Sequence, residues 1–349
     1  MFHALPFILL LSLPASFPGG AKTSLLQKAT PQKPVQHQPA PSTDESAILK
    51  PESLSPYVIE WFIDMNEGAD LKQIWRLLKI EIPGDMPYRC GGDCTAETFD
   101  IPIKGEEQGQ TVALKISFAA GDYYQYLFFK RVNSDSTQGR WKFIGNIDAH
   151  GQRYGSPEHR IESGNNRTWF VIRELQGRGS GMIAYGEAWH EITERGLKQV
   201  LSYPAAGHYI PCQNLLGRSY KSFLVRQEMM SGAYSIQIQF LVSYNISACG
   251  KGSDSPPLFA KGHKVFYVWD DQRQRFILDA SQSDISEKEL NEIYSMQGLS
   301  NEKFMEDNFN ELLTIAGDGS AEQRNWLRQF LTGLADSPRK MTLRQALQQ

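Results

Sequence analysis

The chain has 349 residues and a formal net charge of -3, with a sequence isoelectric point near 6.2. Its 36 Lys and Arg residues are scattered along the chain and form no basic run. This balance argues against a nucleic-acid-binding protein, because phosphate contacts need a concentrated basic surface.

The first segment, Met1–Pro18, contains no Asp, Glu, Lys or Arg. Within it, Ala4–Leu13 is an apolar run with the length of a signal-peptide core. Gly19 and Ala21 supply the small residues of a cleavage site. We therefore expect residues 1–21 to be an export signal and the mature chain to be secreted or periplasmic. The alternative, a buried N-terminal strand, is disfavoured by the prolines in this segment. No later stretch is long and apolar enough for a transmembrane helix, so no membrane span is expected after cleavage.

Residues 22–53 are rich in Lys, Gln, Ser, Thr and Pro. Such a segment has too little apolar surface to offset its ordering entropy and is predicted to be a disordered linker. Residues 54–94 follow as a helical lead-in. Ser55 with Pro56 next is typical of a helix N-terminus, and apolar residues three and four apart predict a helix to Met65. The same spacing predicts a second short helix over Leu71–Leu78.

The four cysteines are an even number, which favours disulfides in an exported chain. Proximity along the sequence suggests the pairs Cys90–Cys94 and Cys212–Cys249. Half of a metal site is the alternative for the first pair. Zinc-binding pairs usually come twice, and the chain has no second pair of this spacing, so we assign no metal.

Residues 95–282 show a period of two, which predicts an antiparallel β domain. The links between successive segments are short, so each segment is expected to pair with its neighbour in a meander of about ten strands. The predicted fold class is α+β, mainly an antiparallel meander that is barrel-, sandwich- or propeller-like, with the helical lead-in and C-terminal helices. The expected strands are Thr95–Ile101, Thr111–Ala119, Tyr123–Val132, Trp141–Asp148, Arg167–Leu175, Gly181–Ile192, Leu197–Ser202, Lys221–Met229, Ala233–Ile246, Lys264–Trp269 and Arg275–Asp279.

The last part, residues 283–349, returns to helical spacing. Helices are expected over 287–296, 300–315 and 320–334, and Ser320 with Gln323 fits a capping box. Trp326 and Phe330 belong to an apolar stripe that we interpret as core rather than as a partner site.

The densest set of ionisable groups lies in residues 148–160, interpreted as a polar loop at a strand end. Asp148 and His150 flank one residue and would share one face of a strand, an arrangement that suits a general base or two metal ligands. Glu158 and His159 would complete such a set if the loop folded back. These four residues are the catalytic candidates, and no third metal ligand is evident from the spacing.

Three further residues are ligand-binding candidates. Arg178 lies in a glycine-rich stretch, residues 176–181, that is interpreted as a flexible hairpin tip, because a phosphate loop needs a helix after its strand. Tyr185 and Trp189 are aromatic residues in a predicted strand, and exposed Tyr and Trp suit sugar rings or a protein partner. Glu187 would share a strand face with Trp189.

The sequence contains no complete catalytic motif and implies no cofactor. The leading hypothesis is a non-catalytic exported binding or interaction module for a glycan or an envelope protein. The alternative is a secreted hydrolase or metal-dependent enzyme that uses the Asp148/His150 loop. A third possibility is an envelope-assembly factor whose C-terminal helices contact a partner chain.

Overall fold

The structure, a computed structural model, describes residues 54–65, 69–81, 94–118, 123–132, 140–151, 157–179, 181–210, 215–230, 233–247, 257–294 and 300–348. The predicted export signal and linker lie outside the described residues. So do Cys90, Cys212 and Cys249, and both cysteine pairings therefore stay predictions.

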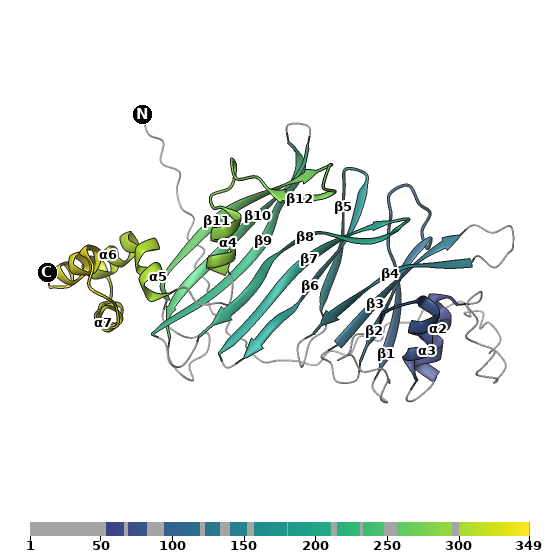
Figure 1. Cartoon of the computed structure of the whole chain (residues 1–349), viewed down its shortest axis with the longest axis horizontal. Helices are drawn as coiled ribbons and strands as arrows, with labels where there is room; N and C mark the ends of the chain where they lie inside the picture. Colours follow the sequence, from purple (N-terminus) through teal and green to yellow (C-terminus); the bar gives the residue numbers. More distant parts are fainter. Residues whose placement is uncertain are drawn as a thin grey trace, which may run out of the picture. The chain divides into compact units, whose positions relative to one another are not determined.

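Twelve antiparallel strands form two sheets within the described part of the chain (Figure 1). Within each sheet every strand pairs with its neighbours in sequence, which confirms the α+β antiparallel meander. The first sheet has the order β1-β2-β3-β4 and the second the order β12-β11-β10-β9-β8-β7-β6-β5, so the expected single meander is in fact two. The strands are β1 (Thr95–Asp100), β2 (Thr111–Ser117), β3 (Tyr123–Val132), β4 (Arg140–His150), β5 (Glu158–Gly164), β6 (Arg167–Gly179), β7 (Met182–Thr193), β8 (Gly196–Tyr209), β9 (Leu216–Met230), β10 (Ala233–Ile246), β11 (Pro257–Asp270) and β12 (Arg275–Leu278).

Strand β5 corrects the sequence interpretation, which placed its residues in a polar loop. Five consecutive residues of this strand, Glu158 to Glu162, are polar except for Ile161, so the segment lacks a clear apolar alternation. Its pairing with β6 nevertheless runs without a register shift from Glu158↔Arg173 to Gly164↔Arg167. Pairing with a long neighbouring strand has overridden the weak local signal.

The described ranges also contain seven helices: α2 (Pro56–Met65), α3 (Leu71–Leu78), α4 (Glu287–Tyr294), α5 (Asn301–Asp307), α6 (Phe309–Asp318), α7 (Ala321–Thr332) and α8 (Pro338–Ala346). The predicted N-cap of α2 is confirmed, because the Ser55 Oγ accepts a hydrogen bond from the Val58 N–H at 3.2 Å. The capping box at the start of α7 is also confirmed. The helix expected over 300–315 is divided at Asn308 into α5 and α6, and α8 was not predicted.

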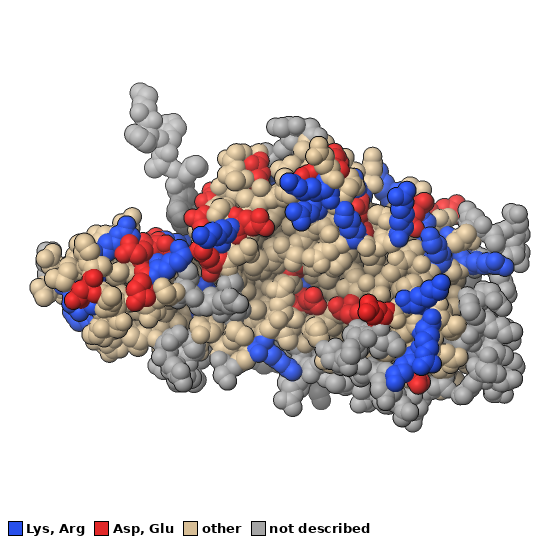
Figure 2. Space-filling view, viewed as in Figure 1, with Lys and Arg blue, Asp and Glu red and all other residues tan. Residues whose placement is uncertain are grey.

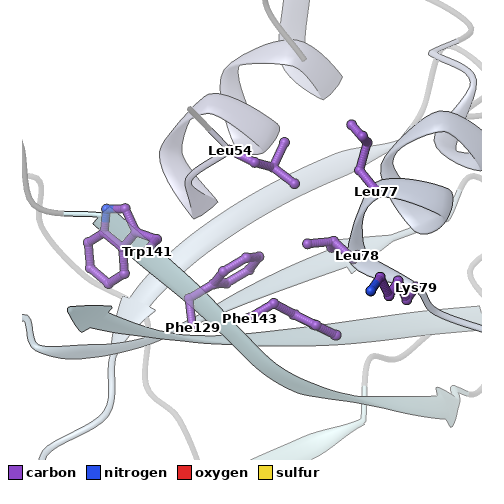
Figure 3. A pocket seen from close by; sticks show the side chains of 7 residues that line it. All are labelled: Leu54, Leu77, Leu78, Lys79, Phe129, Trp141 and Phe143. Carbon is purple, nitrogen blue, oxygen red and sulfur yellow. The ribbon is translucent and has the colours of Figure 1, made fainter. Parts of the chain in front are cut away.

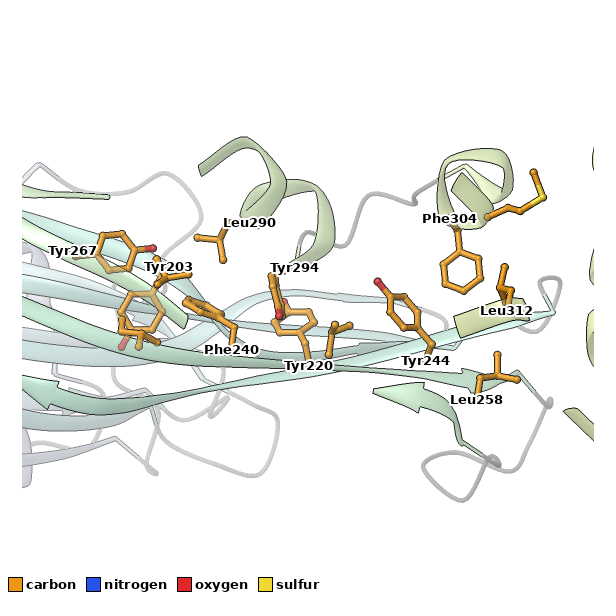
Figure 4. Close-up of a cluster of buried hydrophobic side chains, with 14 of the residues drawn as sticks. Tyr203, Tyr220, Phe240, Tyr244, Leu258, Tyr267, Leu290, Tyr294, Phe304 and Leu312 are labelled. Carbon is orange, nitrogen blue, oxygen red and sulfur yellow. The ribbon is translucent and has the colours of Figure 1, made fainter. Parts of the chain in front are cut away.

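Three hydrophobic clusters hold these elements together. The first joins α2 and α3 to one face of the first sheet, with Trp75 and Leu127 fully buried. The second lies between the two sheets and includes Tyr126 and Phe170. The third packs the C-terminal helices on the second sheet and contains the apolar stripe of α7, which confirms that this stripe is core. Figure 4 shows part of this third cluster, with Tyr294 beside Phe240 at a ring-centroid distance of 5.1 Å.

The second sheet opens between β8 and β9. These two long strands pair only through Ala206–Tyr209 and Arg218–Lys221 among the described residues. Beyond this short ladder β9 continues along β10, and β8 continues along β7. The Lys198 ammonium donates to the backbone oxygen of Arg273 at 3.2 Å, so the β11–β12 turn lies against β8.

Candidate functional site

Asp148 and His150 lie on β4 and share one face of the first sheet, as the alternation predicts. Their cross-strand partners are Gln125 and Tyr123. The Asp148 carboxylate accepts hydrogen bonds from Gln125 at 2.8 Å and from Asn146 at 3.1 Å. The His150 ring lies 5.0 Å from the ring of Tyr123. Within the described residues no hydrogen bond joins Asp148 to His150, so the imidazole is not oriented by this carboxylate.

Glu158 and His159 lie on β5, where adjacent side chains point to opposite faces. The His159 ring stacks on Phe99 at 4.8 Å and on Phe170 at 5.4 Å, at the interface between the sheets. Desolvation by these surroundings and the Lys115 charge lower the pKa of His159. Glu158 instead forms an ion pair with Arg173 at 3.6 Å.

The four catalytic candidates therefore lie on separate surfaces and form no common centre. Asp148 and His150 share the helix-covered face of the first sheet, His159 lies between the sheets, and Glu158 points away from His159. Nor does the described part of the chain contain a group of three or more His, Cys, Asp and Glu side chains that could hold a metal ion.

The ligand-binding candidates lie on the β6–β7 hairpin. The Arg173 guanidinium lies 5.5 Å from the ring of Tyr185, which is half-buried. Arg178 is exposed and pairs with Ile183 in the ladder. Strand β6 extends to Gly179, so most of the glycine-rich stretch is paired strand rather than a flexible tip.

Trp189 is fully buried, which corrects the expectation of an exposed ring. Its indole N–H donates to Glu187 Oε1 at 3.2 Å, so the two side chains do share one face. The Glu187 carboxylate also accepts two hydrogen bonds from Arg160, at 2.6 and 2.8 Å, and a short one from the Tyr203 hydroxyl. Burial alone would raise the pKa of Glu187, but the hydrogen bonds and charge of these partners lower it overall.

The network continues across the open part of the second sheet. Arg160 also donates to Glu162 at 2.8 Å, and the Glu162 carboxylate accepts from Gln227 at 2.7 Å. The Tyr234 hydroxyl donates to Gln227 at 2.6 Å. This polar network, defined as Tyr203, Glu187, Arg160, Glu162, Gln227 and Tyr234, links β8, β7, β5, β9 and β10. Its donors and acceptors satisfy one another, which is the arrangement of a structural network rather than of a ligand site.

A pocket of about 220 Å³ lies between the N-terminal helices and the first sheet (Figure 3). The helical layer contributes aliphatic side chains and the sheet contributes aromatic ones. Phe129 and Leu54 are buried, whereas Leu77, Leu78, Trp141 and Phe143 are only half-buried. The described lining, called here the helix–sheet pocket, is Leu54, Leu77, Leu78, Lys79, Phe129, Trp141 and Phe143.

A β-bulge places the aromatic wall of the helix–sheet pocket. The register between β3 and β4 shifts from Phe128↔Gly145 to Phe129↔Phe143, which leaves Ile144 as the extra residue. Such an insertion reverses which residues of the strand face a given side. Ile144 therefore joins the cluster between the sheets, while Phe143 and Trp141 face the helices.

Lys79 is the one charged residue in the described lining of the pocket. It follows the last turn of α3 in a left-handed conformation, with φ 57° and ψ 36°, and its backbone N–H donates to the carbonyl oxygens of the last turn. The side chain is exposed, and its ammonium has no hydrogen bond or ion pair to any described residue. Sequence reasoning missed this site, because its residues come from the segment before α2, from the end of α3 and from two strands that are distant in sequence.

Comparison of the chain with protein-family models, with curated proteins and with solved structures found no match. None of the helices in the described ranges has the length and apolar character needed to cross a membrane.

Proposed function

We propose that this chain is a non-catalytic binding protein and that the helix–sheet pocket is its ligand site. The observation that carries the proposal is the composition of the described lining: three aliphatic and three aromatic side chains around an opening, with a single charge. Ligand sites are typically concave and mostly apolar, with few polar groups that fix orientation. The separation of Asp148, His150, Glu158 and His159 in space supports a binding role over the hydrolase alternative.

A fluorescence titration with Nile red, a neutral apolar dye, tests this proposal. We expect saturable binding to the wild-type protein. Leu78→Trp should weaken binding at least tenfold, because Leu78 is half-buried in the pocket wall and the larger side chain would fill the opening. The matched control is Leu313→Trp, at an exposed position on α6, and it should bind as the wild type does.

Circular dichroism would establish that both variants fold, so that a loss of binding is not a loss of structure. Equal binding by Leu78→Trp and the wild type would contradict the assignment of the pocket. An absence of saturable binding to the wild type would contradict a site for apolar ligands altogether.

Export to the periplasm or the extracellular space is part of the same proposal and is supported by the apolar run Ala4–Leu13. N-terminal sequencing of the exported chain should begin at Lys22, and an intact Met1 would contradict cleavage.

A glycan or envelope-protein partner is a separate proposal that now depends on Arg178 and Tyr185, because Trp189 is buried. Titration with oligosaccharides should then show binding that Tyr185→Ala removes.

A further inference from the structure

We infer that the helix–sheet pocket takes a small amphiphile with an apolar end and one anionic head, and that Lys79 binds the head. This inference rests on the proposed function, namely that the pocket is a ligand site. It assigns the chemical class of the ligand and the residue that selects it.

The first argument is charge. The described lining contains one cation, Lys79, and no Asp or Glu. The Lys79 side chain is exposed and forms no hydrogen bond or ion pair with a described residue. An ion pair formed beside an apolar wall is stronger than one in open water, because the local dielectric constant is lower.

Charged residues of both signs lie near the pocket without lining it. Arg131 lies opposite Trp141 in the β3–β4 ladder and is exposed. Its charge acts on Tyr57, whose ring meets Trp141 at 5.8 Å. Two acidic residues, Glu60 and Asp100, also act on Tyr57, but neither lines the pocket. Figure 2 shows Lys and Arg side chains together with Asp and Glu side chains on one face of this part of the molecule.

The second argument is the backbone of Lys79. The left-handed conformation after a helix usually belongs to glycine or asparagine, because a Cβ atom is strained there. Lys79 adopts it with φ 57°. Strained residues of this kind cluster at functional sites, and Lys79 lines the pocket.

An interaction of Lys79 with the dipole of α3 is the structural alternative. The two explanations differ in their consequence for Lys79→Gly. A dipole role predicts a less stable protein, whereas a ligand-binding role predicts a protein at least as stable that has lost its preference for anions.

The third argument is size. The pocket volume of about 220 Å³ is below the roughly 300–1,000 Å³ of sites that enclose a drug-sized ligand. It would therefore hold only the apolar end of a ligand, such as a short acyl chain or a single ring system. The charged head would remain at the rim, where Lys79 is.

Displacement of bound Nile red by three amphiphiles with the same ten-carbon chain tests the inference. Decanoate, decanol and decyltrimethylammonium would each be titrated below the micellar concentration. For the wild type we expect decanoate to displace the dye at a concentration at least tenfold lower than decanol does. Decyltrimethylammonium should need the highest concentration of the three. Added salt should weaken the binding of decanoate and leave the binding of decanol unchanged.

Lys79→Met keeps the apolar stem of the side chain and removes the charge. We expect this variant to lose the preference, so that decanoate displaces the dye at a concentration within about twofold of that of decanol. The matched control is Lys288→Met on α4, whose side chain is highly exposed, and it should keep the wild-type preference.

The outcomes separate the two proposals. One outcome is that Leu78→Trp abolishes dye binding but the wild type shows no preference for decanoate. This outcome would overturn the inference of an anionic ligand and leave the proposed function in place. If the dye does not bind to the wild type, both the proposed function and the anionic-ligand inference are contradicted. Binding to vesicles of anionic lipid without binding of monomeric decanoate would overturn the assignment of a free amphiphile.

Discussion

The buried ion pair between Arg160 and Glu187 gives the sharpest prediction for stability. In Glu187→Gln the carboxylate is lost, while four donors from Arg160, Tyr203 and Trp189 still point at the side chain. Removing one partner of a fully buried pair costs about 3–5 kcal/mol. Arg160 is 38% exposed and keeps Glu162 as a second partner, so water and that carboxylate recover part of the cost. We therefore expect a loss of about 2–3 kcal/mol, below the full burial value.

Chemical denaturation measures this loss as a lower midpoint with an unchanged slope. The control is Glu228→Gln, because Glu228 pairs with Arg226 at 2.8 Å on the surface, where a pair contributes about 0–1 kcal/mol. A double-mutant cycle with Arg160→Met should show that the two losses are not additive. A loss below about 0.5 kcal/mol for Glu187→Gln, or additive losses in the cycle, would refute a coupled buried pair.

The pH dependence of this loss has a defined sign. The folded-state pKa of Glu187 lies below its ordinary value of 4.5. The carboxylate therefore contributes its full stability above pH 4.5, and this contribution disappears as the pH falls through the lower folded-state pKa. The difference in unfolding free energy between the wild type and Glu187→Gln should shrink in acid.

Three further predictions concern single positions. Burial lowers the pKa of His190 from 6.5 to about 4, so stability should fall as the pH drops between these values, by up to about 1.4 kcal/mol per pH unit. His190→Leu should flatten that part of a pH series of unfolding curves, and an unchanged slope would contradict a neutral buried histidine. Lys79→Gly should raise stability by about 0.5–1 kcal/mol, because glycine relieves the left-handed strain, and a lower melting temperature would contradict this. Gly207→Ala should cost about 1–3 kcal/mol, because the new Cβ would lie 2.8 Å from the Ile183 carbonyl oxygen. Gly317→Ala, in the last turn of α6 with no atom within 4 Å of the new Cβ, should instead stabilise by up to about 0.5–1 kcal/mol in the same melts, and equal effects of the two variants would refute the steric argument.

The sequence predicts most of the local structure because that structure depends on local patterns. Alternation and turn residues locate β3 and β10 with their observed bounds, and the Ser55 and Ser320 caps start their helices where expected. The division into two sheets is not local. In both sheets, strands that are adjacent in sequence pair with each other. No residue pattern in the sequence indicates that β4 and β5, which are also adjacent in sequence, do not pair.

The candidate site depends on features that the sequence does not carry. Strict alternation would place Trp141 and Phe143 on the face of Ile147, but the bulge at Ile144 turns them to the helices. The left-handed backbone conformation of Lys79 could not be predicted from the sequence either, because lysine rarely adopts it. The four catalytic candidates do not converge, for a related reason. Once Glu158 and His159 belong to a strand, adjacent positions cannot serve one site.

The most direct test of the central claim follows the tryptophan indole N–H resonances by NMR while decanol is added. Trp141 lines the helix–sheet pocket, whereas Trp326 lies in the C-terminal helices and donates to the Leu215 carbonyl oxygen at 2.7 Å. The account predicts a saturable shift of the Trp141 resonance, assigned with Trp141→Phe, and a stationary Trp326 resonance. A stationary Trp141 resonance while another tryptophan shifts would contradict the helix–sheet pocket as the ligand site.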